Sequence, residues 1–105
     1  MLMIRMTEQP GNTHVARSFA EANALLRHMA GKQLQSQALT MKIEVMNCCH
    51  DLLLEDEIEL RRLLSSNEPN LHASLLRNLA DRLKTAALSE RTSVTALMRQ
   101  LTLLN

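Results

Sequence analysis

The spacing of apolar residues changes within the last third of the chain. Over residues 70–76 apolar and polar side chains alternate, which is typical of a strand with one buried face. Beyond residue 76 the apolar side chains recur every three or four positions, as on one face of a helix, on both sides of the polar segment 89–92. Ser93 stands where the second helix would need an N-cap. The pattern therefore predicts a short strand followed by two helices.

The first 69 residues have a mainly helical pattern. Thr13 is expected to cap a helix that runs to about Ala30, because its apolar residues lie three or four positions apart. A second helical pattern covers residues 35–64. It fits one long helix or two, the second of which would carry the acidic run 55–57 in its first turn, where the helix dipole favours negative charge.

Three shorter stretches frame these helices. Residues 1–6 are apolar and indicate either a strand or a disordered start. Residues 9–12, which include Pro10 and Gly11, predict a turn. Residues 65–70, with Pro69, predict a linker. We therefore expect a helical region, residues 1–69, followed by a second module, residues 70–105.

Composition favours packing between helices. Of 105 residues 46% are hydrophobic and 22% charged, as in a globular protein, yet Phe19 is the only aromatic residue. An aliphatic core, with 2 glycines and 2 prolines for tight turns, favours long helices over a β-sandwich. We predict a mainly α fold with one short strand, and an all-α helical bundle is the alternative. Apolar helix faces on so short a chain also predict a homodimer.

Charge is divided unevenly along the chain. Residues 1–69 carry seven Lys and Arg against nine Asp and Glu, or −2, whereas residues 70–105 carry five against two, or +3. The basic end is the candidate for contact with phosphate. No apolar run approaches the roughly 18 residues of a spanning helix, and the apolar start before Arg5 is too short for a signal sequence. A cytoplasmic protein outside the membrane is expected.

Residues 70–105 resemble a ribbon-helix-helix DNA-binding module. The resemblance is carried by the short strand, by "RLK..A" in the first helix and by "TSVTALMRQ" at the start of the second. In that family the strands of two chains pair into an antiparallel ribbon that enters the major groove, while the helices interlock. The resemblance implies DNA contacts from Asn70, His72 and Ser74 on the ribbon, Arg77 beside it, and Thr92 and Ser93 at a phosphate. It also implies a dimer core of Leu71, Ala73, Leu75, Leu83, Leu97, Met98 and Leu101.

No motif for catalysis or metal binding is evident. Cys48, Cys49 and His50 are adjacent, but a zinc site needs ligands two to four residues apart and a second pair elsewhere, which this sequence lacks. We expect the two cysteines to pack in the core or half-buried; a redox or metal role and an intersubunit contact are the alternatives. The chain has no glycine-rich phosphate loop, and its acidic run resembles a solvated patch. We expect neither enzymatic activity nor a cofactor.

These patterns predict a small, homodimeric, sequence-specific DNA-binding protein, such as a transcriptional regulator or a plasmid or phage accessory factor. Residues 1–69 would then offer a surface for a protein partner. The alternative is an all-helical protein-interaction factor, such as a secretion chaperone, an adaptor or an inhibitor, that binds an apolar helix of its partner. Salt separates the two, because phosphate contacts weaken steeply as salt rises.

Overall fold

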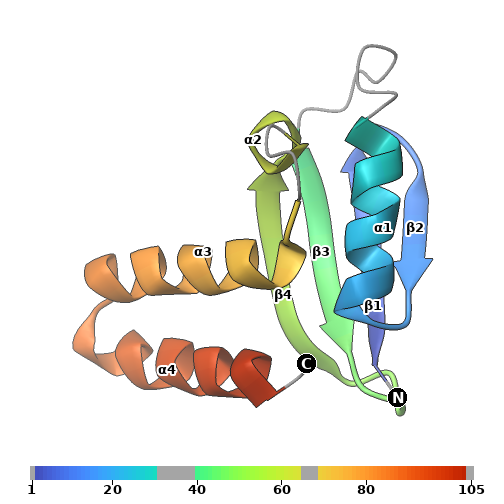
Figure 1. Ribbon diagram of the computed structural model, residues 1–105. Coiled ribbons are helices and arrows are strands. Elements are labelled where there is room, and N and C mark those ends of the chain that lie inside the picture. Colours follow the sequence, from blue (N-terminus) through green and yellow to red (C-terminus); the bar gives the residue numbers. More distant parts are fainter. Residues whose placement is uncertain (1, 31–39, 65–68, 104–105) are drawn as a thin grey trace.

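The computed structural model describes residues 2–30, 40–64 and 69–103. In these residues a four-stranded antiparallel sheet is combined with helices (Figure 1). The elements are β1 (Met3–Gln9), β2 (Thr13–Ala16), α1 (Phe19–Ala30), β3 (Thr40–Met46), β4 (Leu52–Glu59), α2 (Leu60–Leu64), α3 (Leu71–Thr85) and α4 (Leu88–Leu103). The fold is α+β. The predictions of a mainly α fold with one short strand and of an all-α bundle are both wrong.

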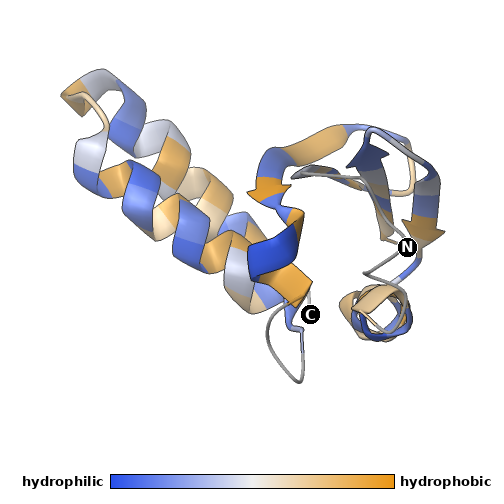
Figure 2. Cartoon of the chain, turned by 90° about the horizontal axis from the view of Figure 1, so that it is seen from above, coloured by the Kyte–Doolittle hydropathy of each residue, from blue (hydrophilic) through white to orange (hydrophobic). Residues whose placement is uncertain are grey.

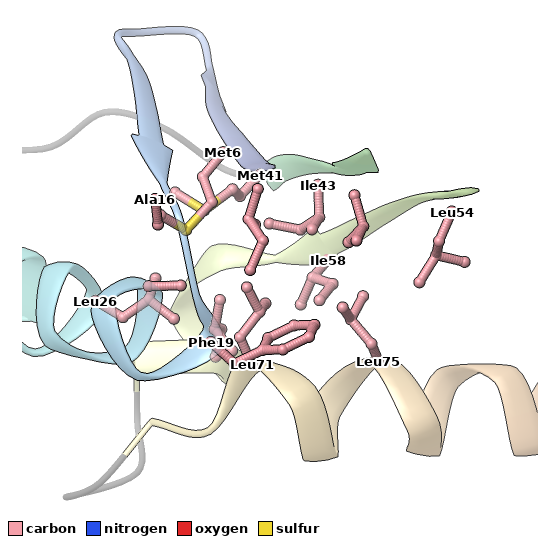
Figure 3. Packing of buried hydrophobic residues seen from close by; sticks show 14 of the residues in the cluster. Met6, Ala16, Phe19, Leu26, Met41, Ile43, Leu54, Ile58, Leu71 and Leu75 are labelled. Carbon is pink, nitrogen blue, oxygen red and sulfur yellow. The ribbon is translucent and has the colours of Figure 1, made fainter. Parts of the chain in front are cut away.

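The sheet has the strand order β2-β1-β3-β4, and each neighbouring pair is antiparallel. Its register sets Ile4 opposite Val45 and Met41 opposite Ile58. These four side chains are buried on the inner face of the sheet, against which α1 and α3 pack (Figure 3). Because side chains alternate along a strand, residues such as Lys42 belong to the opposite, outer face.

One hydrophobic core joins side chains from both ends of the chain. From the strands and first two helices it takes Ile4, Met6, Ala16, Phe19, Ala22, Leu26, Met41, Ile43, Val45, Leu54, Ile58, Leu60, Leu63 and Leu64, and from the last two helices Leu71, Leu75, Leu79, Val94 and Leu101. Residues 65–68 of the predicted linker lie outside the described part of the chain. Of the remaining two linker residues, Pro69 is buried and Asn70 is exposed. The hydrophobic core is thus continuous across the boundary expected between two modules.

Residues 40–59 form a β-hairpin where a helical pattern was predicted. Met41, Ile43 and Val45 are fully buried and alternate with the half-exposed Lys42 and Glu44. Two of the three buried residues are β-branched, which favours a strand. The prediction of one or two long helices over residues 35–64 is therefore wrong. Of residues 40–64, only the five-residue α2 is helical, and residues 35–39 lie outside the described part of the chain.

The N-terminal region begins with a second hairpin. The apolar start is confirmed as a strand, β1, and the turn predicted at residues 9–12 separates it from β2. Glu8 donates its backbone N–H to the carbonyl oxygen of Asn12 at 2.9 Å. Gly11 has φ +147°, a conformation that other residues rarely adopt, and a Cβ there would approach the Cβ of Glu8 to 2.9 Å. This glycine therefore suits the tight turn.

Helix α1 begins later than predicted, at Phe19, because the capping residue is Ser18 rather than Thr13. The Ser18 hydroxyl accepts the backbone N–H of Glu21 at 3.1 Å, and the Glu21 carboxylate accepts the backbone N–H of Arg17 at 3.2 Å. This is a variant of the capping box, in which the two side chains satisfy free N–H groups at a helix start. Thr13 instead begins β2, which pairs with β1.

The segment expected to form the ribbon is the first part of α3. Leu71, Leu75 and Leu79 are fully buried and four residues apart, so they occupy one helical face, whereas Ala73 is exposed. The predicted strand, and with it the ribbon-helix-helix architecture, is wrong. The second helix of the pair was correctly expected, but α4 starts at Leu88, so that Ser93 is not its N-cap.

Candidate functional site

Helices α3 and α4, joined by Ala86 and Ala87, form a helical hairpin that extends away from the sheet (Figure 1). At its base, His72 lies where α1, α3 and α4 meet. Its Nε2 donates to the carbonyl oxygen of Leu101 at 2.7 Å, and its ring meets the ring of Phe19 edge-on, with centroids 4.9 Å apart and planes at 73°. The imidazole therefore ties the last turn of α4 to the first turns of α3 and α1.

Two asparagines satisfy the N-terminal N–H groups of α3. Asn70, the N-cap, accepts the backbone N–H of Ala73 through its side-chain oxygen at 3.0 Å. The side-chain oxygen of Asn23, on α1, accepts the backbone N–H of Leu71 at 2.9 Å. The hairpin is consequently fixed at its base by polar bonds as well as by the buried leucines of α3.

The far half of the hairpin has no third layer over it (Figure 2). Its apolar side chains Leu83, Ala86 and Leu97 are only partly buried, between the two helices. They border a groove of about 330 Å³, whose lining is Arg82, Thr85, Ala86, Glu90, Ser93, Val94 and Leu97. The hairpin thus presents mixed apolar and polar surface beyond the main core.

The surface of α4 turned away from the core carries little charge. At 100° per residue, six exposed side chains share one side of the helix, and we call them the outer face of α4: Leu88, Thr92, Thr95, Ala96, Arg99 and Leu103. Leu88 is 82% exposed and Leu103 is 78% exposed, the largest values among the large apolar residues described. Arg99 is the single charged member. Such a surface is typical of a contact with another protein.

Sequence reasoning did not identify this surface. Neither Leu88 nor Leu103 was assigned to a helical face, because the second helix was expected to start only at Ser93. Their separation of 15 residues, close to four helical turns, was the available signal. It becomes visible only when α4 is known to begin at Leu88.

The residues predicted to contact DNA do not share one surface. His72 and Ser74 are half-buried, and the side chains of Asn70 and His72 bond within the fold. Arg77 is exposed on α3, and Thr92 and Ser93 are exposed on α4. Of the predicted dimer core, Leu71, Leu75 and Leu101 are buried within a single chain, Leu83, Leu97 and Met98 are half-buried, and Ala73 is exposed.

The outer face of the sheet bears charged side chains that pair with one another. Arg5 binds the Glu44 carboxylate through Nε at 2.9 Å and Nη2 at 3.0 Å, and Lys42 lies 3.1 Å from the carboxylate of Glu55. The hydrogen bond and then the charge of Glu55 raise the pKa of Lys42 above its ordinary value. Because these ions satisfy each other, this face is less suited to capture a charged ligand than a surface with unpaired charge.

Glu44→Gln is expected to destabilise the protein slightly at pH 7 and to destabilise it less at pH 3. Hydrogen bonding from Arg5 lowers the pKa of Glu44 in the folded state, so the unfolded chain binds the proton more tightly. The stabilisation is therefore present above the unfolded-state pKa of about 4.3 and is lost as the pH falls through the lower folded-state pKa. Urea unfolding at both pH values measures the change. An equal difference at both pH values would contradict it, and Arg5→Gln should reproduce the loss at pH 7.

The two cysteines are exposed rather than packed in the core. Cys48 and Cys49 lie in the turn between β3 and β4, and neither forms a disulfide. The prediction that they are core or half-buried residues is wrong, because residues 47–51 form a surface turn and not the middle of a helix. Their Sγ atoms are 3.9 Å apart.

A shallow hollow of about 300 Å³ lies beside the first hairpin, with the lining Glu8, Asn12, His14, His28, Met29, Leu60 and Leu64. The His14 Nε2 is 3.1 Å from a carboxylate oxygen of Glu8. A carboxylate can orient an imidazole in this way for proton transfer, but the described residues of the lining include no serine, threonine or cysteine nucleophile. In the described residues, no group of three or more His, Cys, Asp or Glu is placed to hold a metal ion.

None of the described helices is long and apolar enough to span a bilayer. Neither a protein-family model, nor a curated protein, nor a solved structure matches the chain.

Proposed function

We propose that this chain is a protein-interaction module that acts as a homodimer, and that two copies associate through the outer face of α4. The observation that carries the proposal is the pair of highly exposed leucines, Leu88 and Leu103, at opposite ends of one weakly charged helical face. If another surface covers these two side chains, apolar area is removed from water, which favours association.

The outer face of α4 is complementary to a second copy of itself. Leu88 and Leu103 are 15 residues apart, or about 22 Å along the helix. In an antiparallel, two-fold pair of α4 helices, Leu88 of one copy meets Leu103 of the other, because a two-fold contact is reciprocal. The midpoint falls between Thr95 and Ala96, whose small side chains allow the two helices to approach closely.

Charge also permits this arrangement. The same two-fold register sets Arg99 opposite Thr92 of the second copy, so no like charges meet. Each copy would contribute its hairpin, and the two hairpins together form a four-helix bundle, a common way to cover apolar helix faces. The groove beside Leu97 lies on the other side of α4 and would stay open to a further partner.

The magnitude of the apolar term indicates moderate affinity. Burial of four leucines contributes about 6–12 kcal/mol at roughly 1.5–3 kcal/mol each. Association costs about 4–15 kcal/mol in lost freedom. At the favourable limit, a gain of about 12 kcal/mol less a cost of about 4 kcal/mol leaves about 8 kcal/mol, which corresponds to a dissociation constant of about 1 µM. The dimer is therefore expected at micromolar or higher protein concentrations rather than at nanomolar ones.

Sedimentation equilibrium of the parent chain and of charge variants tests the proposal. Two double variants are compared: one carries Leu88→Glu and Leu103→Glu, and the other carries Leu88→Lys and Leu103→Lys. Each variant alone should be monomeric, because every contact in its dimer would join like charges. An equimolar mixture of the two variants should restore a heterodimer, since each Glu then meets a Lys. Leu52→Glu changes another exposed leucine, on β4, and should leave the dimer intact.

A monomeric parent chain at several hundred micromolar would contradict the proposal. A charge-swapped mixture that stays monomeric while the parent dimerises would also contradict the proposal, because another surface would then be in contact.

We also propose a reducing, cytoplasmic environment for the chain. Its two cysteines are exposed and form no disulfide, which agrees with such an environment.

DNA binding is the second candidate function, and one observation favours it. Residues 70–105 carry five basic against two acidic side chains, and Arg77, Arg82 and Lys84 are exposed on α3. Binding to duplex fragments that weakens steeply with salt, and weakens further in Arg77→Ala, would support it. No retention on DNA at low salt by the folded protein would leave protein interaction as the function.

A further inference from the structure

A small hollow between β4, α2 and α3 has a basic lining. Its volume is about 40 Å³, and it is lined by Ile58, Arg62, Leu63, Ser74, Arg77 and Asn78. Ile58 and Leu63 are buried apolar residues, whereas the other four side chains end in hydrogen-bonding groups. Two guanidinium groups, from Arg62 on α2 and Arg77 on α3, therefore border one hollow together with a hydroxyl and an amide.

The helical spacing of α3 brings three of these polar groups to one side. Arg77 and Asn78 follow Ser74 by three and four residues, so the three side chains are neighbours on the helix surface. The Asn78 Nδ2 donates to one carboxylate oxygen of Asp56, on β4, at 3.2 Å. The other oxygen of Asp56 accepts the backbone N–H of Glu57 at 2.9 Å. The Asn78 amide is thus held in place by the sheet.

The charge of Arg77 is not paired within the chain. Neither its guanidinium nor the Ser74 hydroxyl forms a hydrogen bond or an ion pair in the part of the chain that the structure describes. The outer face of the sheet differs, because Arg5 and Lys42 there each pair with a glutamate. The hollow therefore retains donors that can bind an anion.

The donors around the hollow suit phosphate. Guanidinium groups bind phosphate oxygens through parallel N–H donors, and they stay charged at any physiological pH. We propose that the hollow binds the terminal phosphate of a small phosphate monoester, with Arg62 and Arg77 on the charged oxygens and Ser74 and Asn78 as neutral donors. A phosphate monoester carries a charge of about −1.5 to −2 at pH 7, which two guanidinium groups balance.

The size of the hollow limits how much of the ligand it takes. A volume of about 40 Å³ is roughly three times the minimum for one water molecule, so the phosphate group enters and the rest of the ligand lies outside. Asp56 weakens the binding, because its negative charge lies next to Asn78 and repels the anion. Arg62 and Arg77 are exposed, so water also screens their attraction. We expect a dissociation constant on the order of 1 mM.

NMR titration of the ¹⁵N-labelled chain with methyl phosphate, at constant ionic strength, tests the site. Saturable shifts are expected at the backbone amides of residues 74–78 and at the Nε–H of Arg77. Arg77→Gln should weaken binding by roughly tenfold or more, because it removes a hydrogen bond between charged groups. Arg82→Gln is the matched control. It makes the same change of charge at an exposed position of the same helix, outside the hollow, so the affinity should not change.

Asp56→Asn should have the opposite effect. It keeps an oxygen that can accept from Asn78 and removes the repelling charge, so methyl phosphate should bind roughly threefold more tightly. Circular dichroism checks that the variant is folded. Weaker binding by the folded variant would contradict the proposal.

Dimethyl phosphate distinguishes a monoester from the phosphodiester of a nucleic acid. It carries one negative charge and has a substituent on two of its oxygens, so it should bind at least roughly tenfold more weakly than methyl phosphate. Equal binding of the two compounds would overturn the proposal, since the hollow would then suit a nucleic acid backbone. Equal losses in Arg77→Gln and Arg82→Gln, or no saturable shift in the parent chain, would also overturn it. The site is independent of the dimer proposed above, because none of its residues belongs to the outer face of α4.

Discussion

Leu75→Ala is expected to lower the free energy of unfolding by about 2–5 kcal/mol, the usual range for a truncated core leucine. Leu75 is fully buried between α3 and the inner face of the sheet (Figure 3). Its truncation removes apolar contacts and leaves a cavity that surrounding side chains fill only in part. Urea unfolding followed by circular dichroism, at one fixed protein concentration, measures the change.

Ala73→Asp is the control for this prediction, because it distinguishes a helix from a strand. On α3, Ala73 is exposed two residues before Leu75, so a carboxylate there should alter the free energy of unfolding by no more than about 0.5 kcal/mol. In a paired ribbon, Ala73 and Leu75 would both face the core, and both changes would be severe. Severe destabilisation by Ala73→Asp would therefore argue against α3 as described.

Phe19→Ala should be equally damaging, at about 3–5 kcal/mol. Phe19 is the only aromatic side chain, is 7% exposed, and packs at the first turn of α1 against the ring of His72. Its loss removes a large apolar group and the edge-on ring contact that joins α1 to the base of the hairpin. Chemical unfolding measured as for Leu75 gives the free energy.

Phe19→Leu separates these two contributions. Leucine keeps much of the apolar volume but lacks a ring, so the loss should fall to about 0.5–1.5 kcal/mol, the range measured for an aromatic pair beyond burial. In a His72→Ala background the loss caused by Phe19→Leu should shrink, because the partner ring is absent. A loss under about 1 kcal/mol for Phe19→Ala would contradict the buried position of this side chain.

The sequence was informative where a local pattern had one interpretation. The turn at residues 9–12 and the two helices near the C-terminus were correctly predicted, and the apolar start was left open between a strand and disorder. Turn-forming residues act over four positions, and a long amphipathic stretch repeats its signal several times. These elements depend little on which segment packs against them.

The errors have one common cause, which is that a spacing of four residues fits a strand face and a helix face equally well. Met41 and Val45 are four apart on β3, and Leu71 and Leu75 are four apart on α3. The range 35–64, which contains the first pair, was interpreted as helical, and residues 70–76, which contain the second, were interpreted as extended. Both pairs lie in the other kind of element. The intervening residue decides: Ile43 is buried with its neighbours, whereas Ala73 is exposed.

The local capping signals would have corrected part of this. Ser18 and Glu21 have the spacing of a capping box, and Asn70 precedes Leu71 as an N-cap should. Neither signal reveals that the Asn23 side chain also binds the first turn of α3, since that contact joins residues 48 positions apart. The candidate surface on α4 was also not predictable, because it depends on where α4 begins in the folded chain.

The outer strand β4 has a consequence for how far assembly can proceed. One side of this strand is not paired within the sheet, and its sequence carries Glu55, Asp56, Glu57 and Glu59. If another copy aligned its own β4 antiparallel along that edge, carboxylates would face carboxylates across the junction, which disfavours the pairing. A two-fold contact through α4 is closed, because it uses the same patch on both partners. Pairing between two β4 edges is therefore opposed, and the proposed dimer through α4 would not extend along this strand.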